Sequence, residues 1–362
     1  MRRAAEYYRA KFGRLPRGMW PAEGAVSSSV VDLFAEAGIA WIATDRGVLQ
    51  RSGRWGYRVD DPNVLCRPYR AGEGERRLSV FSRDTTLSDR IGFHYQSYAD
   101  AEQAAADFIA EIKARFAHRV DDPPNRVLSV ILDGENAWSA YRESARPFLH
   151  ALYRRLGVDP EIRTVTFAEF LEGNPARRVV SHPASSHERV YDLFCGSWIG
   201  EMGSRSGVEL GTWIGEPEEN RAWELLREAR QTLSERAATP ERHPAAYESL
   251  YAAEGSDWFW WYGDDQSADH GSEFDELFRT HVKQIYCGLG RRVPSRLSQP
   301  LVPRTVIWSF EHPVGQIERS DRLAIQTHCR GVLTWAAEDA EVPQRAELTA
   351  VGGVMAGVRR YR

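Results

Sequence analysis

Up to about residue 190, two kinds of hydrophobic pattern alternate along the chain. Short apolar runs rich in β-branched and aromatic residues predict strands, and longer stretches with apolar residues every three or four positions predict helices. The predicted strands are Arg17–Trp20, Ile39–Asp45, Leu78–Ser82, Val127–Asp133 and Arg163–Phe167, and the predicted helices are Ser27–Ala37, Ala99–Phe116 and Ala145–Leu156. Strands that alternate with helices indicate a parallel α/β sheet or barrel. The first of these helices starts with serines that could cap it and ends before Gly38.

The pattern changes after residue 190. Residues Trp223–Ala237 and Glu273–Leu289 predict amphipathic helices on either side of an aromatic segment, which indicates a helical subdomain. A proline-spaced stretch follows, and strand-like fragments occupy the tail of the sequence. The predicted organisation is an α/β domain at 1–189, a helical subdomain at 190–293, a linker at 294–318 and the start of a β-rich domain at 319–362.

Composition and charge narrow the class of protein. The chain has 47 Lys and Arg against 51 Asp and Glu, and no basic run, which argues against a nucleic-acid partner. Its cysteines, Cys66, Cys195, Cys287 and Cys329, form no C-x-x-C pair, so neither a zinc site nor a disulfide scaffold is signalled. The first residues contain no apolar stretch of secretory or membrane-spanning length. We therefore expect a cytoplasmic protein without a membrane partner.

The first candidate site is the segment GMWPAEGAVS, residues 18–27. A short strand runs into Pro21, and Glu23 stands just before a predicted helix. Side chains at the carboxyl ends of strands line the active sites of α/β barrels, so Glu23 is well placed for chemistry. Alternatively, Glu23 complements the positive end of the dipole of the following helix.

The second candidate is VLSVILDGENAW, residues 127–138, in which an apolar run ends at Asp133. A buried strand that delivers an acid at its carboxyl end is a common way to present a general acid or base. An ordinary Asp-Gly turn is the alternative. Because Glu135, Asn136 and Trp138 crowd the same strand end, a functional site is favoured.

The third candidate is AEGSDWFWWYGDD, residues 253–265, where aromatic rings stand among four acids. Rings stack on the apolar faces of sugars and carboxylates bind their hydroxyls, so this composition favours a sugar site. The 12 tryptophans of the chain fit the same interpretation without requiring it. A metal site is the alternative, but the acids lack the regular spacing of a calcium loop.

Seven segments in this order resemble the amylopullulanase-type and α-amylase-type members of glycoside hydrolase family 57: GMWPAEGAVS, WIATDRGVL, FSRDTTLSDRIGF, VILDGENAW, GSWIG, WIGEPEENRAW and AEGSDWFWWYGDD. The resemblance implies an incomplete (β/α)7 barrel beside a helical domain. It also implies a retaining mechanism on α-glucans such as starch, glycogen or maltooligosaccharides, in which two carboxyl groups stand about 5 Å apart.

The same resemblance assigns roles to individual residues. It makes Glu23 the nucleophile and Asp133 the general acid/base, and it places Asp257 and Trp260 at substrate-binding positions. Trp20, Glu135 and Asn136 would support the substrate site. The resemblance implies no metal and no organic cofactor, and the sequence carries no signal for an oligomeric state.

Two alternatives to hydrolysis stay open. The first is a 4-α-glucanotransferase or branching enzyme with the same two carboxylates, and the second is a non-catalytic glucan-binding homologue. Members of the family begin with a strand that carries a His-Gln-Pro motif and then a second strand motif, and neither occurs in this sequence. We therefore expect the sequence to begin inside the domain, with lower activity and stability than a chain extended upstream.

Overall fold

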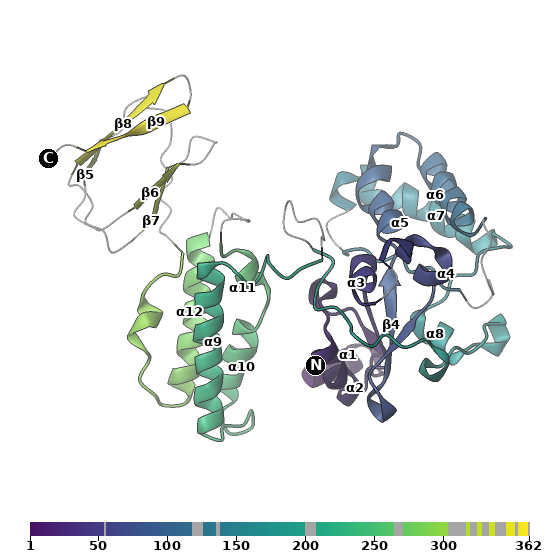
Figure 1. The fold of residues 1–362 in the computed structure, drawn as a ribbon, viewed down its shortest axis with the longest axis horizontal. Coiled ribbons are helices and arrows are strands. Elements are labelled where there is room, and N and C mark those ends of the chain that lie inside the picture. The colour runs from purple at the N-terminus through teal and green to yellow at the C-terminus, as the bar shows by residue number, and fades with distance from the viewer. Residues whose placement is uncertain are drawn as a thin grey trace. The chain divides into compact units, whose positions relative to one another are not determined.

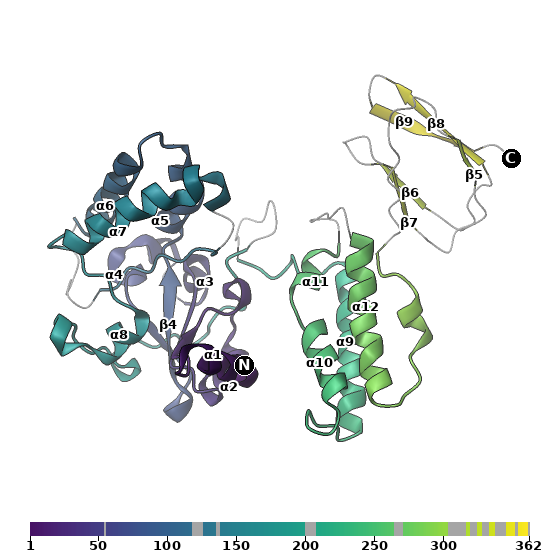
Figure 2. The ribbon, with the colours of Figure 1, turned by 180° about the vertical axis from the view of Figure 1, so that it is seen from behind.

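A computed structural model describes residues 1–53, 56–117, 126–134, 138–199, 208–263 and 271–302, and the backbone alone of five strands that follow. The described chain divides into two compact units, Met1–Leu210 and Gly211–Arg362 (Figures 1 and 2). Val190, Leu193 and Val208 lie in the core of the first unit. The first unit therefore extends beyond residue 189, where we predicted a domain boundary.

The first unit is built on a four-stranded sheet in the order β1-β2-β4-β3. Its strands are β1 (Gly18–Met19), β2 (Trp41–Asp45), β3 (Tyr69–Ala71) and β4 (Leu78–Arg83). β1, β2 and β4 are parallel, as predicted, and every residue of β4 is buried. Burial of a parallel strand on both faces explains why β4 shows no alternation of buried and exposed positions: its apolar residues and its serines are all buried. In this register Asp45 lies opposite Arg83, so two charged residues end neighbouring strands.

Two of the predicted strands are wrong. Residues 127–133 carry a single parallel bridge, between Ser129 and Arg83, and no strand. The backbone groups of Leu128 and Val130 have no hydrogen-bond partner among the described residues. Residues 163–167 form no strand either, because Thr166 caps the helix α8 (Phe167–Glu172) by accepting a hydrogen bond from the Glu169 amide at 3.0 Å. The antiparallel strand β3 was not predicted.

Helices cover the sheet of the first unit. The longest, α6 (Ala101–Phe116) and α7 (Arg146–Val158), lie side by side in both views and share a core that contains Tyr95, Phe108 and Phe148 (Figures 1 and 2). The shorter helices are α1 (Arg2–Phe12), α2 (Val31–Glu36), α3 (Arg46–Arg51), α4 (Pro62–Leu65), α5 (Thr85–Asp89) and α8, together with single turns η1 (Ala22–Gly24), η2 (Ser28–Val30), η3 (Gly56–Asp60), η4 (Gly74–Arg76), η5 (Arg90–His94), η6 (Tyr95–Ser97), η8 (Trp138–Ala140), η9 (Arg142–Ala145), η10 (Pro175–Arg177) and η11 (Ala184–Ser186).

Of the two end signals of the helix predicted at Ser27–Ala37, only the glycine at its C-terminal end is confirmed. Gly38 adopts a φ of 81° directly after α2, as a glycine at a helix end does. The serines do not cap the helix. Instead, the Ser28 hydroxyl accepts a hydrogen bond from the Leu193 amide at 2.9 Å and so ties this segment to residues far along the chain.

The second unit contains four helices among its described residues, and α9, α10 and α12 run alongside one another (Figures 1 and 2). The four helices are α9 (Pro217–Glu235), α10 (Pro244–Ala253), α11 (Asp257–Trp260) and α12 (Gly271–Gly288), and the single turn η12 (Ser295–Ser298) follows them. A capping box between Glu216 and Glu219 starts α9. α10 and α12 approach closely at Gly288, where a Cβ atom would lie 2.9 Å from the Ala246 nitrogen.

A buried ion pair anchors the chain that follows α12. The Arg279 guanidinium donates to Asp275 through Nε at 2.9 Å, and both side chains are less than a tenth exposed. The other carboxylate oxygen of Asp275 accepts from the Leu301 amide at 3.2 Å, and Arg279 Nη1 donates to the Leu297 carbonyl. Residues 297–301 are therefore fixed to α12 by charge-assisted hydrogen bonds.

The last strands form two antiparallel sheets. One has the order β5-β8-β9, and the other pairs β6 with β7. Their bounds are β5 (Gln316–Glu318), β6 (Ala324–Thr327), β7 (Leu333–Ala336), β8 (Arg345–Val351) and β9 (Val354–Arg360). Within the described parts of the chain, none of the helices combines the length and the apolar character that crossing a membrane requires.

Asp275→Ala should lower the free energy of unfolding by about 3–5 kcal/mol, because Arg279 would remain buried without its partner. Chemical denaturation measures the change. The matched control is Glu276→Ala, which removes the adjacent, exposed carboxylate and should change stability by about 0.5 kcal/mol or less. Equal effects of the two substitutions would contradict a structural role for the ion pair.

Candidate active site

Glu23 occupies a left-handed turn at the carboxyl end of β1. Its φ of 55° and ψ of 25° are uncommon for a residue with a side chain, and such strain persists only where surrounding contacts hold it. The turn closes through a hydrogen bond from the Gly24 amide to the Pro21 carbonyl at 2.8 Å. From the neighbouring strand β2, the Thr44 hydroxyl donates to the Gly24 carbonyl at 2.7 Å.

Trp198 holds the carboxylate of Glu23. Its indole Nε1 donates to Glu23 Oε2 at 2.6 Å, and its amide donates to the Glu23 carbonyl at 3.1 Å. Backbone hydrogen bonds in both directions between Val26 and Gly196 keep the two segments together. The Trp20 ring meets the Trp198 ring edge-on, with centroids 5.0 Å apart. Side chain and backbone of Glu23 are therefore both fixed by one residue from a distant part of the chain.

The alternative interpretation, in which Glu23 complements the dipole of the following helix, is wrong. The helix α2 begins at Val31, and the acid in its first turn is Asp32. The effect of a helix dipole falls off within the first turn, which Glu23 precedes.

Asp133 follows an extended segment that β4 and α5 hold in place. The Ile131 amide donates to the Ser88 hydroxyl at 3.1 Å, and Arg83 Nε donates to the Ile131 carbonyl at 2.8 Å. Asp133 itself is half-buried. Glu135 and Asn136 lie outside the described residues. Trp138 is half-buried and packs against Tyr141, with ring centroids 5.8 Å apart.

A buried cluster of charges lies at the carboxyl ends of β2 and β4. Arg83 donates to Asp89 at 2.6 Å and reaches Asp45 at 3.5 Å, while the Thr85 hydroxyl donates to Asp45 at 2.8 Å. Burial raises the pKa of Asp45, and the hydrogen bonds from the Gly47 amide and from Thr85 act in the opposite direction.

Sequence reasoning missed Trp198 and Arg83 as site residues. The available signal for Arg83 was its position directly after the predicted strand Leu78–Ser82, while Asp45 ends the predicted strand before it. For Trp198 the only signal was its place in the segment GSWIG. Its contact with Glu23 could not be predicted, because the two residues are 175 positions apart in the sequence.

Asp257 and Trp260 belong to the second unit. Asp257 begins α11 and is exposed, and Trp260 is half-buried against Trp213, with ring centroids 5.6 Å apart. Between them along the chain, Phe259 is fully buried and stacks on Trp223. The aromatic run thus supplies both core residues and partly exposed rings.

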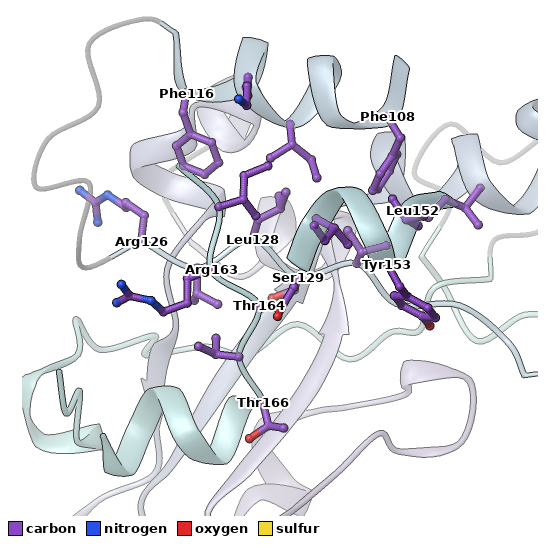
Figure 3. Close-up of a pocket in the computed structure, with 18 of the residues that line it drawn as sticks. Phe108, Phe116, Arg126, Leu128, Ser129, Leu152, Tyr153, Arg163, Thr164 and Thr166 are labelled. Carbon is purple, nitrogen blue, oxygen red and sulfur yellow. The ribbon is translucent and has the colours of Figure 1, made fainter. Parts of the chain in front are cut away.

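A cavity of about 1220 Å³ lies in the first unit (Figure 3). α6 and α7 contribute Phe108, Phe116 and Leu152 to its walls, and the extended segment before Asp133 contributes Leu128. Neither Glu23 nor Asp133 lines it. Lys113, Arg126 and Arg163 line it beside the apolar side chains. Because neither proposed carboxylate reaches this cavity, we do not assign it to the candidate site.

These features define an α/β protein with a candidate site at the carboxyl ends of parallel strands. The chain belongs to glycosyl hydrolase family 57, whose family model matches residues 1–183. Among curated proteins, none matches the sequence.

Two solved structures share the fold. A 4-α-glucanotransferase from Thermococcus litoralis is 16% identical with a TM-score of 0.57, and the match covers 99% of this chain and 51% of that one. An α-amylase from Thermotoga maritima is 13% identical with a TM-score of 0.53, and the match covers 79% of this chain and 61% of that one. The chain thus spans about half the length of the first structure.

Gly24→Ala should destabilise the fold more than the same change at a glycine with free space around it. A Cβ atom on Gly24, at a φ of 60°, would lie 2.6 Å from a Trp20 ring carbon. Gly74 has a φ of 54° and nothing within 4 Å, so Gly74→Ala is the matched control.

We expect the control to cost about 1–2 kcal/mol from backbone strain alone. Gly24→Ala should cost about 1–3 kcal/mol more, because the Trp20 ring must move. Chemical denaturation measures both values. Equal losses would show that Trp20 does not pack on the turn.

Proposed function

We propose that this chain is the catalytic part of a retaining glycoside hydrolase that acts on α-glucans. Glu23 is the nucleophile in this proposal and Asp133 the general acid/base. The observation that carries it is the strained turn at Glu23, whose carboxylate accepts the Trp198 indole N–H at 2.6 Å. Membership of the family supports glycosidic chemistry, and the two structures of similar fold are named as enzymes of α-glucans.

The reaction would run in two displacements. The Glu23 carboxylate attacks the anomeric carbon while Asp133, protonated, gives its proton to the leaving glycosidic oxygen. In the second step Asp133 takes a proton from water, which attacks the same carbon and releases Glu23. Net retention follows because each step inverts the configuration.

The remaining predicted residues would bind substrate. Trp20, Glu135 and Asn136 support the sugar beside the carboxylates, and Asp257 and Trp260 are substrate-binding residues of the second unit. No metal or organic cofactor enters either step. We also propose that the protein is cytoplasmic, because the spacing of its four cysteines signals no disulfide scaffold.

A glucanotransferase or branching enzyme is the second candidate. One of the two structures of similar fold is named a 4-α-glucanotransferase, and for this reason we keep the candidate. The two activities share both carboxylates and differ in whether water or a sugar hydroxyl attacks the intermediate.

Incubation with maltooligosaccharides separates the candidates. A rise in reducing ends indicates hydrolysis, and a redistribution of chain lengths at constant reducing ends indicates transfer. Binding of the full-length protein to a glucan column without any product would indicate a non-catalytic homologue and overturn the proposal.

Glu23→Gln should abolish turnover and leave folding intact, because a carboxamide cannot attack the anomeric carbon. Azide added to Glu23→Ala should restore part of the activity and give a glycosyl azide of inverted configuration. Glu6→Gln, at an exposed position of α1, is the control and should keep full activity. Retention of more than a few per cent of activity by Glu23→Gln would make the assignment wrong.

Asp133→Asn should be severely impaired on maltooligosaccharides and much less so on aryl glycosides with a good leaving group, which needs little protonation. Measured kcat/KM values for a series of leaving groups test this expectation. A uniform loss across the series would indicate a structural role for Asp133 instead.

Trp260→Ala should weaken substrate binding with a modest loss of stability, since this ring is only partly buried. The adjacent Phe259→Ala is the matched control. Phe259 is fully buried, and its truncation should cost about 3–5 kcal/mol. Thermal melts and glucan-binding measurements give the two quantities. If both variants lose the same stability, Trp260 is a core residue.

A further inference from the structure

The indole of Trp198 makes three specific contacts in the first unit. Its N–H donates to Glu23 Oε2 at 2.6 Å, its edge meets the Trp20 ring, and its face lies under Arg83, with Cζ 5.0 Å from the ring centroid. The second unit offers a contrast. There, Trp223 and Trp258 donate their indole N–H groups to the backbone carbonyls of Trp213 and Ala252.

Arg83 connects this indole to the segment that carries Asp133. Its side chain is 7% exposed, and its Nε donates to the Ile131 carbonyl at 2.8 Å, two residues before Asp133. The remaining nitrogens are held by Asp89 at 2.6 Å and by Asp45 at 3.5 Å. A guanidinium held by carboxylates at its other nitrogens has little freedom to turn. One rigid cation therefore touches the residue that binds Glu23 and the backbone that leads to Asp133.

We propose that Trp198 and Arg83 are positioning residues for the two catalytic carboxylates. Trp198 fixes the Glu23 carboxylate through a short charge-assisted hydrogen bond, which favours its ionised form. Arg83 fixes Trp198 through a cation–π contact, strengthens the indole as a donor by polarising it, and fixes the segment before Asp133. The inference rests on the proposed function only for its kinetic consequences, since the contacts themselves are testable without turnover.

The first experiment measures the indole N–H resonances by NMR of protein labelled with ¹⁵N-tryptophan. Trp198→Phe identifies the Trp198 signal by its loss. We expect this proton to resonate downfield of the indoles bonded to backbone carbonyls, and to move upfield in Glu23→Gln, whose neutral carboxamide is a weaker acceptor. A signal that does not respond to Glu23→Gln overturns the role of Trp198, whether or not the protein is a glycosidase.

The second experiment compares steady-state kinetics of Trp198→Phe and the wild type. Loss of one hydrogen bond to a charged group should lower kcat about 10- to 100-fold and leave KM within about 2-fold. Trp41→Phe is the matched control, because the Trp41 indole N–H has no hydrogen-bond partner among the described residues. It should keep the wild-type kcat. Equal losses in the two variants, or a loss confined to KM, would overturn the proposal.

The third experiment tests Arg83 with Arg83→Lys, which keeps the charge but loses the planar fork. The fall in kcat/KM should be larger for maltooligosaccharides than for aryl glycosides with good leaving groups, because Asp133 is displaced. Trp198→Phe should lose the same factor on both substrates. Asp89→Asn keeps the guanidinium but removes the charge of one of its acceptors. It should show the same dependence on the leaving group as Arg83→Lys, with a smaller loss of kcat/KM. Uniform losses in both Arg83→Lys and Asp89→Asn would overturn the link to Asp133.

Discussion

The left-handed backbone at Glu23 is the constraint on which the candidate site depends. Such a conformation costs about 1–3 kcal/mol for a residue with a side chain, so it must be held by contacts from outside the turn. Three contacts hold it: one from Thr44 in β2, and two from residues 196–198, namely the Val26–Gly196 pairing and Trp198. The turn is thus stable only when β1, β2 and residues 196–198 are assembled, and Glu23 gains a defined orientation as a consequence of the whole fold of the first unit.

The parallel sheet explains why charges gather beside this turn. Parallel strands direct their carboxyl ends to one edge, and there β2 ends in Asp45 and β4 in Arg83. Both are buried, which is unfavourable for either alone, and the cost is offset by pairing and by hydrogen bonds from Thr85 and Gly47. A cluster satisfied in this way is rigid. The cluster can therefore fix nearby groups that lie outside the strands, namely Trp198 and the segment before Asp133.

Sequence patterns predicted the parallel strands and the long helices, because their signals are local. β4 is a short segment with Leu78, Val80 and Phe81 close together, and α6 shows apolar positions at helical spacing. The prediction at 163–167 was wrong for a local reason, the helix cap at Thr166, whereas the prediction at 127–133 was wrong for a non-local one. An apolar run becomes a strand only when neighbours complete its hydrogen bonds, and Leu128 and Val130 have no such neighbours among the described residues. In the same way, Glu23 could be found from its motif and the strand before it, whereas Trp198 is adjacent to it only in the folded chain.

The tryptophans show how far composition can be interpreted. A high count suggested a sugar-binding protein, but the structure assigns the rings to different environments according to the partner of each indole N–H. Those of Trp223 and Trp258 satisfy backbone carbonyls and serve packing of the helical unit, while that of Trp198 satisfies a carboxylate. An indole bonded to a carboxylate controls the orientation of an ionisable group, so the partner of the N–H, rather than the number of rings, distinguishes a structural tryptophan from one that serves a reaction.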